Sequence, residues 1–326
     1  MSLQKAAAKC PFCQTEQAPR FVLDKVNENG SFSLYHCQNC GGEYFAPFFH
    51  PGGDWYEKGD PYNVKESFSP RDLHCYHKYF LSNQIELEGK AVLEFGCGTG
   101  EFLAELAKHG ADVYGVDIDN SAIAIARSAF SLNNLFPMSI GDFVKNPPRA
   151  EFDYLTMFEV FEHVDNPIDI LQSAHRLLKN GGKIFISIPS RDRIFLNFSG
   201  WDFPYHHLSR WDGQSFTTIL KLNGFSDVKV SYINRYNQLR ELFLEILADK
   251  FHFKSARKFK QDDGSNKVSI KPSLKQKTKQ TILRLVYPLA RFIGVKMLPN
   301  ILAVIFYPVL LVFYPKSGVM FFEARK

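Results

Sequence analysis

The sequence predicts an α/β protein organised around a mostly parallel β-sheet, and three observations lead to this fold class. The segment VLEFGCGTG (residues 92–100) reads as a buried strand that ends in a glycine-rich turn and opens a helix near Glu101. Strand-like and helical segments then alternate from residue 112 to residue 233. Acidic residues also stand where the first two strands end, at the edge where open α/β sheets bind their ligands.

The glycine-rich turn predicts a nucleotide-like ligand. Glycines at 96, 98 and 100 let the backbone turn sharply and approach a ligand closely, since they carry no Cβ. Such a turn alone is also compatible with a nicotinamide-type site. The spacing here is E-x-G-x-G-x-G rather than G-x-G-x-x-G, which suits a nucleoside without a pyrophosphate. Glu94, at the strand end, favours a cationic or amino-bearing ligand.

The next strand, residues 112–116, repeats this logic. It ends on Asp117, about 20 residues after the glycine turn, where a carboxylate is positioned to accept both ribose hydroxyls. Ile118 can then pack on the face of an adenine ring. A helix (residues 121–131) and a short third strand follow, and then Gly-Asp-Phe at 141–143, where Asp142 is placed to hold the adenine amino group.

Together with FDYLTMFEVFEHVDNP (152–167) and LLKNGGKIFISIPS (177–190), these segments resemble the class I S-adenosylmethionine (SAM) methyltransferases. The likeness is to the methyltransferase-23 and ubiquinone O-methyltransferase type and runs from about Lys90 to Arg235. It implies a seven-stranded Rossmann-like sheet, with six parallel strands and an antiparallel last strand, and SAM as the cofactor. The implied SAM contacts are Glu94, Gly96, Cys97, Gly98, Gly100, Asp117, Ile118, Asp142, Phe143 and Phe158.

Two C-x-x-C pairs near the N-terminus predict a structural zinc ribbon. The four thiols, Cys10, Cys13, Cys37 and Cys40, have a spacing that suits tetrahedral Zn²⁺ better than disulfides in a chain without an export signal. The residues between the pairs can form a short hairpin. Four sulfurs leave no open position for chemistry, and redox C-x-x-C motifs come singly beside a βαβ unit. Cys75 and Cys97 are interpreted as small buried apolar residues.

The candidate catalytic residues follow the fourth strand, residues 152–157. Glu159, Glu162 and His163 are spaced i, i+3, i+4, which predicts one shared face of a helical turn. Two interpretations remain open. In one, Glu159 and His163 only fix the loop by hydrogen bonds. In the other, the E-x-x-E-H run joins His207, favoured over its neighbour His206, to hold a divalent metal. The two-Glu, two-His set resembles that of the small-RNA 2′-O-methyltransferases, and the E-x-x-E-H run resembles one in the ubiquinone-pathway O-methyltransferases.

A metal at this site, Mg²⁺, Mn²⁺ or Zn²⁺, would orient a pair of substrate oxygens and lower a hydroxyl pKa. Without a metal, His163 or His207 can itself remove the hydroxyl proton.

The last two strands predicted for the sheet, residues 226–233 and 318–326, are separated by a long insertion at 237–317. It comprises an amphipathic helix (239–253), a polar and basic loop (254–279) and two further segments, 282–297 and 301–314. The last is apolar but only about 14 residues long and is interrupted by Pro308, whereas a bilayer span needs roughly 20. We expect an interfacial hairpin, with basic residues facing anionic headgroups; the alternatives are a helical cap over the substrate cleft and a dimer interface.

The predicted organisation is a zinc ribbon (1–50), a helical lid or linker (51–88, with a helix at 69–83), a SAM-binding domain (89–236 plus 318–326) and the insertion (237–317). The chain of 326 residues carries a mild net charge of +5, which by itself indicates no nucleic-acid partner. The first nine residues lack the apolar core of a signal peptide. These features indicate a cytoplasmic protein, peripheral or monotopic on the cytoplasmic face of a membrane.

The predicted function is SAM-dependent methylation, at a hydroxyl oxygen, of a lipid-linked or amphiphilic small molecule such as a polyprenyl-linked saccharide or a quinone-like precursor. An RNA methyltransferase that uses the ribbon and the basic loop on phosphates is an alternative, disfavoured by the apolar insertion. A non-catalytic SAM-binding membrane adaptor is a second, disfavoured by the polar groups at Glu159, Glu162, His163 and His207. Nitrogen and carbon acceptors and any oligomeric state stay open.

Overall fold

The computed structural model describes residues 9–27, 29–52, 70, 72–193, 202–233, 236–237, 239–240, 243, 298–313 and 318–326. The chain divides into two compact units. The larger unit comprises Met1–Arg191, Gly200–Ile233 and Val319–Lys326, and the smaller comprises Asp192–Ser199 and Asn234–Gly318. Each unit is described by itself.

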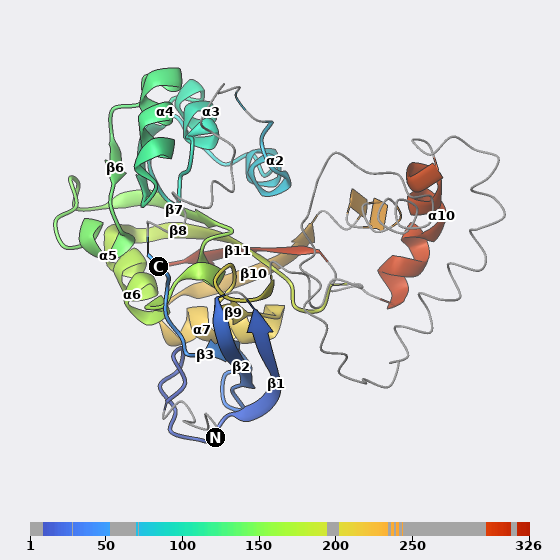
Figure 1. The fold of residues 1–326 in the computed structure, drawn as a ribbon. Coiled ribbons are helices and arrows are strands. Elements are labelled where there is room, and N and C mark those ends of the chain that lie inside the picture. The colour runs from blue at the N-terminus through green and yellow to red at the C-terminus, as the bar shows by residue number, and fades with distance from the viewer. Residues whose placement is uncertain are drawn as a thin grey trace. The chain divides into compact units, whose positions relative to one another are not determined.

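The larger unit is built on a seven-stranded sheet with the order β10-β11-β8-β7-β4-β5-β6 (Figure 1). Its last strand, β11, lies antiparallel between β10 and β8, while β8, β7, β4, β5 and β6 pair in parallel. The predicted seven-stranded, mostly parallel sheet with an antiparallel last strand is therefore confirmed. The strands are β4 (Ala91–Phe95), β5 (Asp112–Asp117), β6 (Leu135–Pro137), β7 (Phe152–Phe158), β8 (Leu178–Pro189), β10 (Ser226–Ile233) and β11 (Val319–Arg325).

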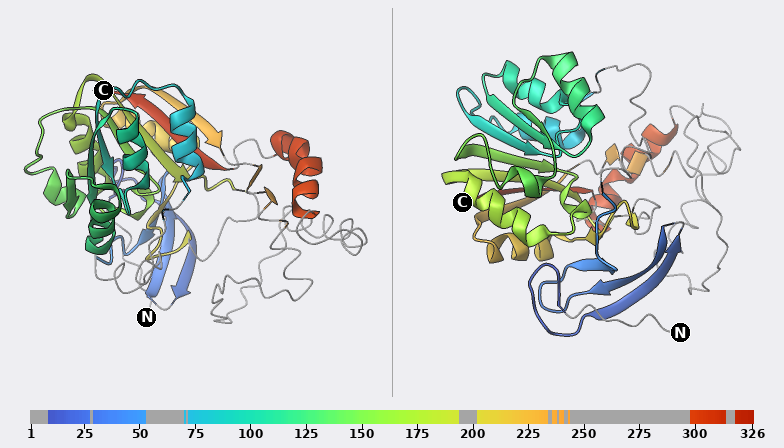
Figure 2. Two further views of the ribbon diagram at one scale, coloured as in Figure 1. Left: turned by 90° about the horizontal axis from the view of Figure 1, so that it is seen from above. Right: turned by 60° about the vertical axis from the view of Figure 1, so that its left-hand side comes forward.

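Helices cover both faces of this sheet, with α2, α3 and α4 on one side and α6 and α7 on the other (Figures 1 and 2). Every residue of the central strand β4 is buried as a result, which is why its sequence is an apolar run rather than an alternating one. The helices are α2 (Cys75–Ser82), α3 (Glu101–Lys108), α4 (Asn120–Phe130), α5 (Ile140–Phe143), the 3-10 helix η1 (Phe161–His163), α6 (Pro167–Leu177) and α7 (Gly213–Leu222).

The lid helix α2 is shorter than the helix predicted at 69–83. It begins only at Cys75, because His74 has an extended backbone and forms a capping box with His77. Elsewhere the local sequence sets the helix starts. The Asp119 side chain accepts hydrogen bonds from two backbone N–H groups at the start of α4, and Asp212 forms a capping box at the start of α7.

A second, four-stranded antiparallel sheet contains the N-terminal ribbon, in the order β1-β2-β3-β9. The hairpin of β1 (Arg20–Asn27) and β2 (Gly30–His36) lies between the two cysteine pairs, as predicted, and β3 (Glu43–Ala46) follows the second pair. The fourth strand, β9 (Ser209–Arg210), was not predicted. It comes from the chain between β8 and α7, and two residues are too few to show a strand pattern.

The smaller unit contains α10 (Leu298–Phe313), an apolar helix without Asp, Glu, Lys or Arg. The expectation that Pro308 interrupts this run is wrong, since the helix continues through it. Proline removes a single backbone donor and can kink a helix without ending it. Most of 239–253, and all of 254–279 and 282–297, lie outside the described residues. Among the residues that the structure describes, none of the helices has the length and apolar character needed to cross a membrane.

Candidate active site

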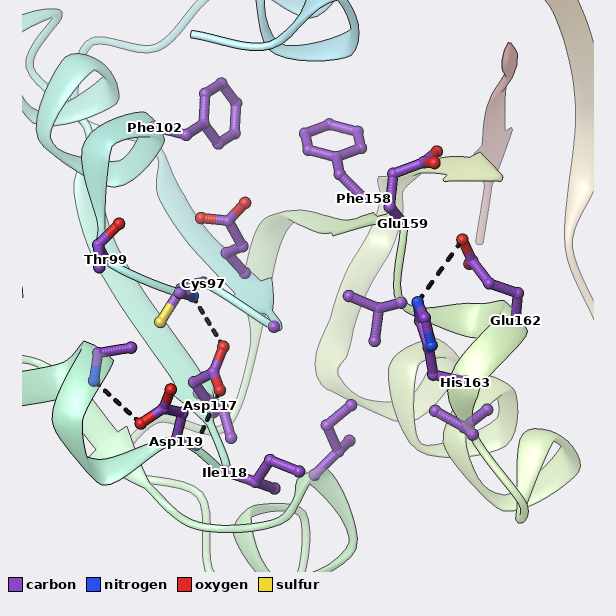
Figure 3. Close-up of a pocket in the computed structure, with 18 of the residues that line it drawn as sticks. Cys97, Thr99, Phe102, Asp117, Ile118, Asp119, Phe158, Glu159, Glu162 and His163 are labelled. Carbon is purple, nitrogen blue, oxygen red and sulfur yellow. Dashed lines mark hydrogen bonds and ion pairs between the residues drawn. The ribbon is translucent and has the colours of Figure 1, made fainter. Parts of the chain in front are cut away.

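A cavity of about 590 Å³ lies at the carboxyl ends of β4, β5 and β7, all within the larger unit. Open α/β sheets bind ligands at this edge, because the loops that follow neighbouring strands meet there. Figure 3 shows two groups of side chains, with Asp117 and Asp119 on one side and Glu162 and His163 on the other. We call the first the cofactor half, lined by residues 94, 96–99, 101–102, 116–119 and 138–141, and the second the acceptor half, lined by residues 50, 159–160, 162–166 and 206–207.

The cofactor half is organised by Asp117, the last residue of β5. Its carboxylate accepts hydrogen bonds from the backbone N–H groups of Gly98, at 2.8 Å, and Asp119, at 2.9 Å. Burial raises the pKa of Asp117, and these backbone hydrogen bonds act in the opposite direction. The carboxylate is thereby oriented into the cavity at the position predicted for a ribose.

Glu94 is the second buried carboxylate of this half, only 3% exposed. Within the described residues its Oε2 atom has no hydrogen-bond partner. Burial, and after it the charges of Asp117 and Glu101, raises the pKa of Glu94 well above its usual range. A buried carboxylate is stabilised by a cation or a strong donor. The cavity therefore suits a ligand with an amino group or another strong donor beside Glu94.

The backbone of the glycine-rich turn packs closely against Val160. Gly96 has a φ of +74°, and a Cβ there would lie 2.3 Å from Cγ2 of Val160. Only glycine is compatible with that approach. Cys97 and Gly98 also line the cavity, as do Ile118 and Phe158, whereas Gly100 does not and instead starts α3.

Besides Gly100, two further predicted cofactor contacts, Asp142 and Phe143, do not lie on the cavity. Asp142 is exposed and forms hydrogen bonds with Ser139 and Lys145, both at 2.7 Å. Phe143 is buried in the core, with its ring centroid 5.2 Å from that of Phe136. The reason is α5, a one-turn helix capped by Ser139 that directs Asp142 outward and Phe143 inward. The residues just before Asp142, at 138–141, line the cavity in their place.

In the acceptor half, three side chains converge from two distant segments. Glu162 and His163 belong to η1, and His207 precedes β9. The Oε1 atom of Glu162 lies 3.9 Å from Nε2 of His163 and 3.9 Å from Nε2 of His207. One ligand atom from each of the three residues lies within 4.8 Å of the others. We call these three residues the Glu-His-His cluster.

The opposite nitrogen of each imidazole has its own partner. Nδ1 of His163 hydrogen-bonds to the backbone carbonyl of His206, and Nδ1 of His207 lies 3.5 Å from Oδ1 of Asp202. Both rings therefore present Nε2 toward Glu162. Burial, with the neighbouring His207 charge as the next cause, holds the pKa of His163 well below its usual range, so this ring is neutral near pH 7. A neutral imidazole can accept a proton or bind a metal.

Glu159 does not join the cluster, contrary to the expected shared helical face. It adopts a left-handed backbone with φ of +54°, and η1 begins only at Phe161, so the 3.6-residue periodicity is broken. Its carboxylate accepts a hydrogen bond from Ser187 at 3.0 Å, and Figure 3 shows it pointing away from His163. The predicted four-residue metal site is thus reduced to Glu162, His163 and His207.

The Glu-His-His cluster fits a divalent metal by its donor chemistry. One carboxylate and two imidazoles form a set that Mn²⁺ and Zn²⁺ accept readily, and Mg²⁺ less so. Metal-binding histidines commonly have their second nitrogen held by a carboxylate or carbonyl, as both rings have here.

Sequence reasoning missed one wall of the acceptor half. His50 lines the cavity, and its backbone N–H donates to Oδ2 of Asp165 at 2.8 Å. It stands just after β3 of the ribbon sheet, far along the chain from the other lining residues. No motif marked this position, because its place in the cavity depends on how the ribbon packs.

The four ribbon cysteines are close together, and all are free thiols. The sulfurs of Cys10 and Cys40 lie 3.8 Å apart, and those of Cys13 and Cys37 lie 3.7 Å apart. Tetrahedral zinc with Zn–S bonds of about 2.3 Å places its sulfurs about 3.8 Å apart. A hydrogen bond with Cys40 lowers the pKa of Cys10 to about 5, and backbone N–H groups of Phe12 and Cys13 act in the same direction. This geometry fits a zinc ribbon.

Comparisons with known proteins agree with the methyltransferase fold and with a cofactor site in this cavity. Residues 72–230 match the model of a methyltransferase domain family. A ubiquinone biosynthesis O-methyltransferase of Coxiella burnetii is 35% identical over 159 residues, which cover 48% of this chain and 65% of that protein. A protein of the same name from Pseudomonas aeruginosa is 29% identical over 134 residues, 39% of this chain and 57% of its own length. The chain thus spans somewhat less than two thirds of these relatives.

Among solved structures, phosphoethanolamine N-methyltransferase 2 of Haemonchus contortus in complex with SAM superposes with a TM-score of 0.51 at 15% identity. The match covers 94% of this chain and 71% of that one. At 15% identity this similarity shows that the two proteins share a fold.

Proposed function

We propose that this protein transfers the methyl group of SAM to a hydroxyl oxygen. The proposal proceeds from residues 72–230, which form a class I SAM-dependent methyltransferase domain. One observation carries the proposal: the Glu-His-His cluster shares a single cavity with Glu94 and Asp117. A cofactor site and a proton-accepting site are thereby brought together, which is what methyl transfer to a hydroxyl requires.

In this proposal the cofactor half binds and orients SAM. Glu94 would hold the amino group and Asp117 the ribose hydroxyls, and the sulfonium of SAM would supply the methyl group within the cavity that the acceptor half also lines. The acceptor oxygen attacks the methyl carbon, an O–C bond forms as the C–S bond breaks, and S-adenosylhomocysteine leaves. In the absence of a bound metal, the hydroxyl proton passes to Nε2 of a neutral imidazole, His163 or His207. Alignment of the two reactants supplies much of the rate enhancement.

The two donor sets have different proposed roles. A divalent ion held by Glu162, His163 and His207 would lower the pKa of a substrate hydroxyl and orient a second oxygen beside it. Zinc held by the four ribbon cysteines would be structural, because its coordination is complete.

The proposed acceptor is a phenolic or otherwise hydroxylated amphiphile at the cytoplasmic face of a membrane. The relatives named above act, by their names, in ubiquinone biosynthesis, which favours a quinone-like acceptor. The smaller unit supports a membrane location, since α10 has no charged residue and exposes large apolar side chains, among them Val304 at 62% and Val312 at 72%. Apolar patches of this kind mark interaction surfaces.

The reaction is tested by incubating the full chain with methyl-tritiated SAM and, separately, host membranes, the soluble fraction, and catechols with or without a polyprenyl tail. We expect label in organic-extractable material and higher kcat/KM for the tailed catechol. Label in soluble molecules alone would remove the lipid-linked acceptor, and label in RNA would overturn the proposal. Turnover that is unchanged by chelator, together with an active Glu162→Ala variant, would exclude the catalytic metal.

The membrane location has its own test. The double variant Val304→Glu/Val312→Glu should reduce binding to anionic phospholipid vesicles by at least about 30-fold, since the two valines, if buried in the bilayer, together contribute roughly 2–4 kcal/mol. Leu222→Glu is the matched control, because Leu222 is 60% exposed but lies on α7 of the larger unit. Equal sedimentation of the double variant and the control would exclude α10 as the membrane contact.

A further inference from the structure

The backbone segment 206–208 contacts every member of the Glu-His-His cluster. The carbonyl of His206 accepts the hydrogen bond from His163, and His207 is itself in the cluster. The N–H of Leu208 donates to the carbonyl of Glu162 at 2.8 Å. A displacement of this short segment would therefore move all three side chains relative to one another.

The ribbon sheet holds this segment from its other side. The N–H of Phe45, in β3, donates to the carbonyl of Leu208 at 3.0 Å. The next residues along the chain form β9, in which Ser209 pairs with Tyr44 and Arg210 pairs with Glu43. Because β9 is only two residues long, its position depends on the edge of β3.

Both cysteine knuckles contact Trp211, the residue after β9, which is 1% exposed. From the first knuckle, the Phe12 ring lies 4.4 Å from the indole, centroid to centroid. At the second knuckle, a Cβ on Gly42 would lie 2.8 Å from the indole and 2.9 Å from Phe12, so a glycine is needed there. The indole N–H donates to the Ser209 hydroxyl at 2.9 Å. The spacing of the knuckles thus bears directly on β9.

A partly buried network of ion pairs links the chain just after β8, the second knuckle, β9 and the start of α7. Arg191, at the end of the stretch after β8, donates to the carbonyl of Gly41 at 2.6 Å and pairs with Asp212. Arg210, 7% exposed, donates to Glu43 at 3.1 Å. Removing one partner of a buried pair leaves the other charge uncompensated, which is costly.

We propose that the cysteine ribbon positions the acceptor half. A zinc ion bound by the four cysteines would fix the distance between the two knuckles, and the knuckles hold Trp211 and β9 in place. The position of β9 in turn fixes His207 and its two cluster partners. The inference rests on the proposed function only for its kinetic readout. The cofactor half is independent of this chain of contacts, since Asp117 is held by hydrogen bonds from residues 98 and 119. Of the described ribbon residues, His50 is the one that lines the cavity, and it does so in the acceptor half.

The experiment compares the full-length wild type with two variants. Cys37→Ser removes a zinc ligand, and Glu43→Gln leaves all four cysteines but weakens the pairing with Arg210. Zinc content, affinity for S-adenosylhomocysteine, hydrogen exchange of the peptides that cover 43–46 and 207–211, and kcat and KM are measured for each.

We expect both variants to bind S-adenosylhomocysteine within about 2-fold of wild type while exchange at 207–211 becomes faster and kcat falls by about 10- to 100-fold, as for a catalytic group displaced by about an ångström. Glu43→Gln should retain its zinc, so it reports on positioning even if Cys37→Ser fails to fold. The control is Glu16→Gln, because Glu16 forms an exposed ion pair with Lys9 at 3.2 Å in the same ribbon, and it should leave every quantity unchanged.

Unchanged exchange at 207–211 in Glu43→Gln, or an equal loss of S-adenosylhomocysteine affinity in both variants, would overturn the inference. The latter would make the ribbon a general stabilising element. Exchange and cofactor affinity do not require turnover. If the wild type transfers no methyl group, the proposed function fails while the exchange data still decide whether the ribbon positions segment 206–208.

Discussion

The two halves of the cavity are built in different ways. In the cofactor half, Glu94, Gly98, Asp117 and Asp119 all come from one β-turn-α-β stretch, and their hydrogen bonds join residues at most 19 positions apart. In the acceptor half, His50, the η1 residues and His207 come from three separate segments, and a ribbon with its own sheet holds one of them. The geometry of the first half is local, whereas that of the second depends on long-range packing. The acceptor half can therefore change without disturbing the cofactor.

The two halves of the cavity also differ in the titratable side chains that they bury. Burial raises the pKa of Glu94 and Asp117, because it disfavours the carboxylate form, and a cationic or donor-rich ligand beside them would offset that cost. Burial lowers the pKa of His163 and holds the pKa of His206 at about 4, so the acceptor half keeps neutral imidazoles. Desolvation is the common cause, because it always disfavours the charged form.

The largest expected effect is on the cofactor half. Asp117→Ala removes the carboxylate that we propose to accept two ribose hydroxyls, each contact worth about 1.5–3 kcal/mol as a charged hydrogen bond, so SAM affinity should fall by about 1,000-fold. Calorimetry measures it, and circular dichroism checks folding. The control is Asp112→Ala, at the other end of β5, where the side chain is 45% exposed. Unchanged affinity in Asp117→Ala would contradict the cofactor assignment.

A smaller effect is expected in the acceptor half. His207→Asn should lower kcat by about 100-fold through the loss of a proton acceptor or metal ligand, while the affinity for SAM stays within about 2-fold. The matched control is His109→Asn, because His109 is an exposed histidine just after α3 whose ring pairs with Glu105, and its replacement should leave kcat unchanged. If His207→Asn weakened SAM binding as much as it lowered kcat, the two halves would not be separable.

The lid helix α2 supplies a pH-dependent prediction. The His77 ring stacks on Phe102, with centroids 4.4 Å apart, and burial lowers the pKa of His77 to about 3. The unfolded chain takes up this proton near pH 6.5 but the folded chain does not, so His77 reduces stability as the pH falls below 6.5. His77→Phe should remove up to about 2 kcal/mol of the loss between pH 7.5 and pH 5, measured by urea unfolding at both values. An identical loss in variant and wild type would show that His77 is protonated in the folded state.

The smallest effect is expected at Asp142. Its carboxylate is exposed and pairs with Lys145, and the structure places it off the cavity. Asp142→Ala should therefore change SAM affinity by less than about 2-fold, since exposed pairs contribute little. Calorimetry beside Asp117→Ala gives the contrast directly. A loss of 10-fold or more would mean that Asp142 reaches the cofactor after all.

Much of the fold follows from local patterns. The buried strand β4, the glycine turn after it and the carboxylate at the end of β5 were each predicted, because a strand covered on both faces needs an apolar run and a tight turn needs glycine. The C-terminal position of the last strand was also predicted. The predictions of individual site residues were wrong where the backbone conformation of one residue decides the direction of its side chain. Glu159 left the expected helical face because of its positive φ, and α5 turned Asp142 outward.

The sequence by itself determined the mostly parallel sheet, the cofactor half and the four-cysteine knuckles, because each of these depends on residues that are close together in the chain. Only the tertiary structure decided that β9 completes the ribbon sheet, that Trp211 lies between the two knuckles, and that His50 and His207 meet in one cavity. The physical reason is that these contacts join segments about 160 to 200 residues apart. No local periodicity or spacing encodes such pairings; the complementary shapes of the packed surfaces select them.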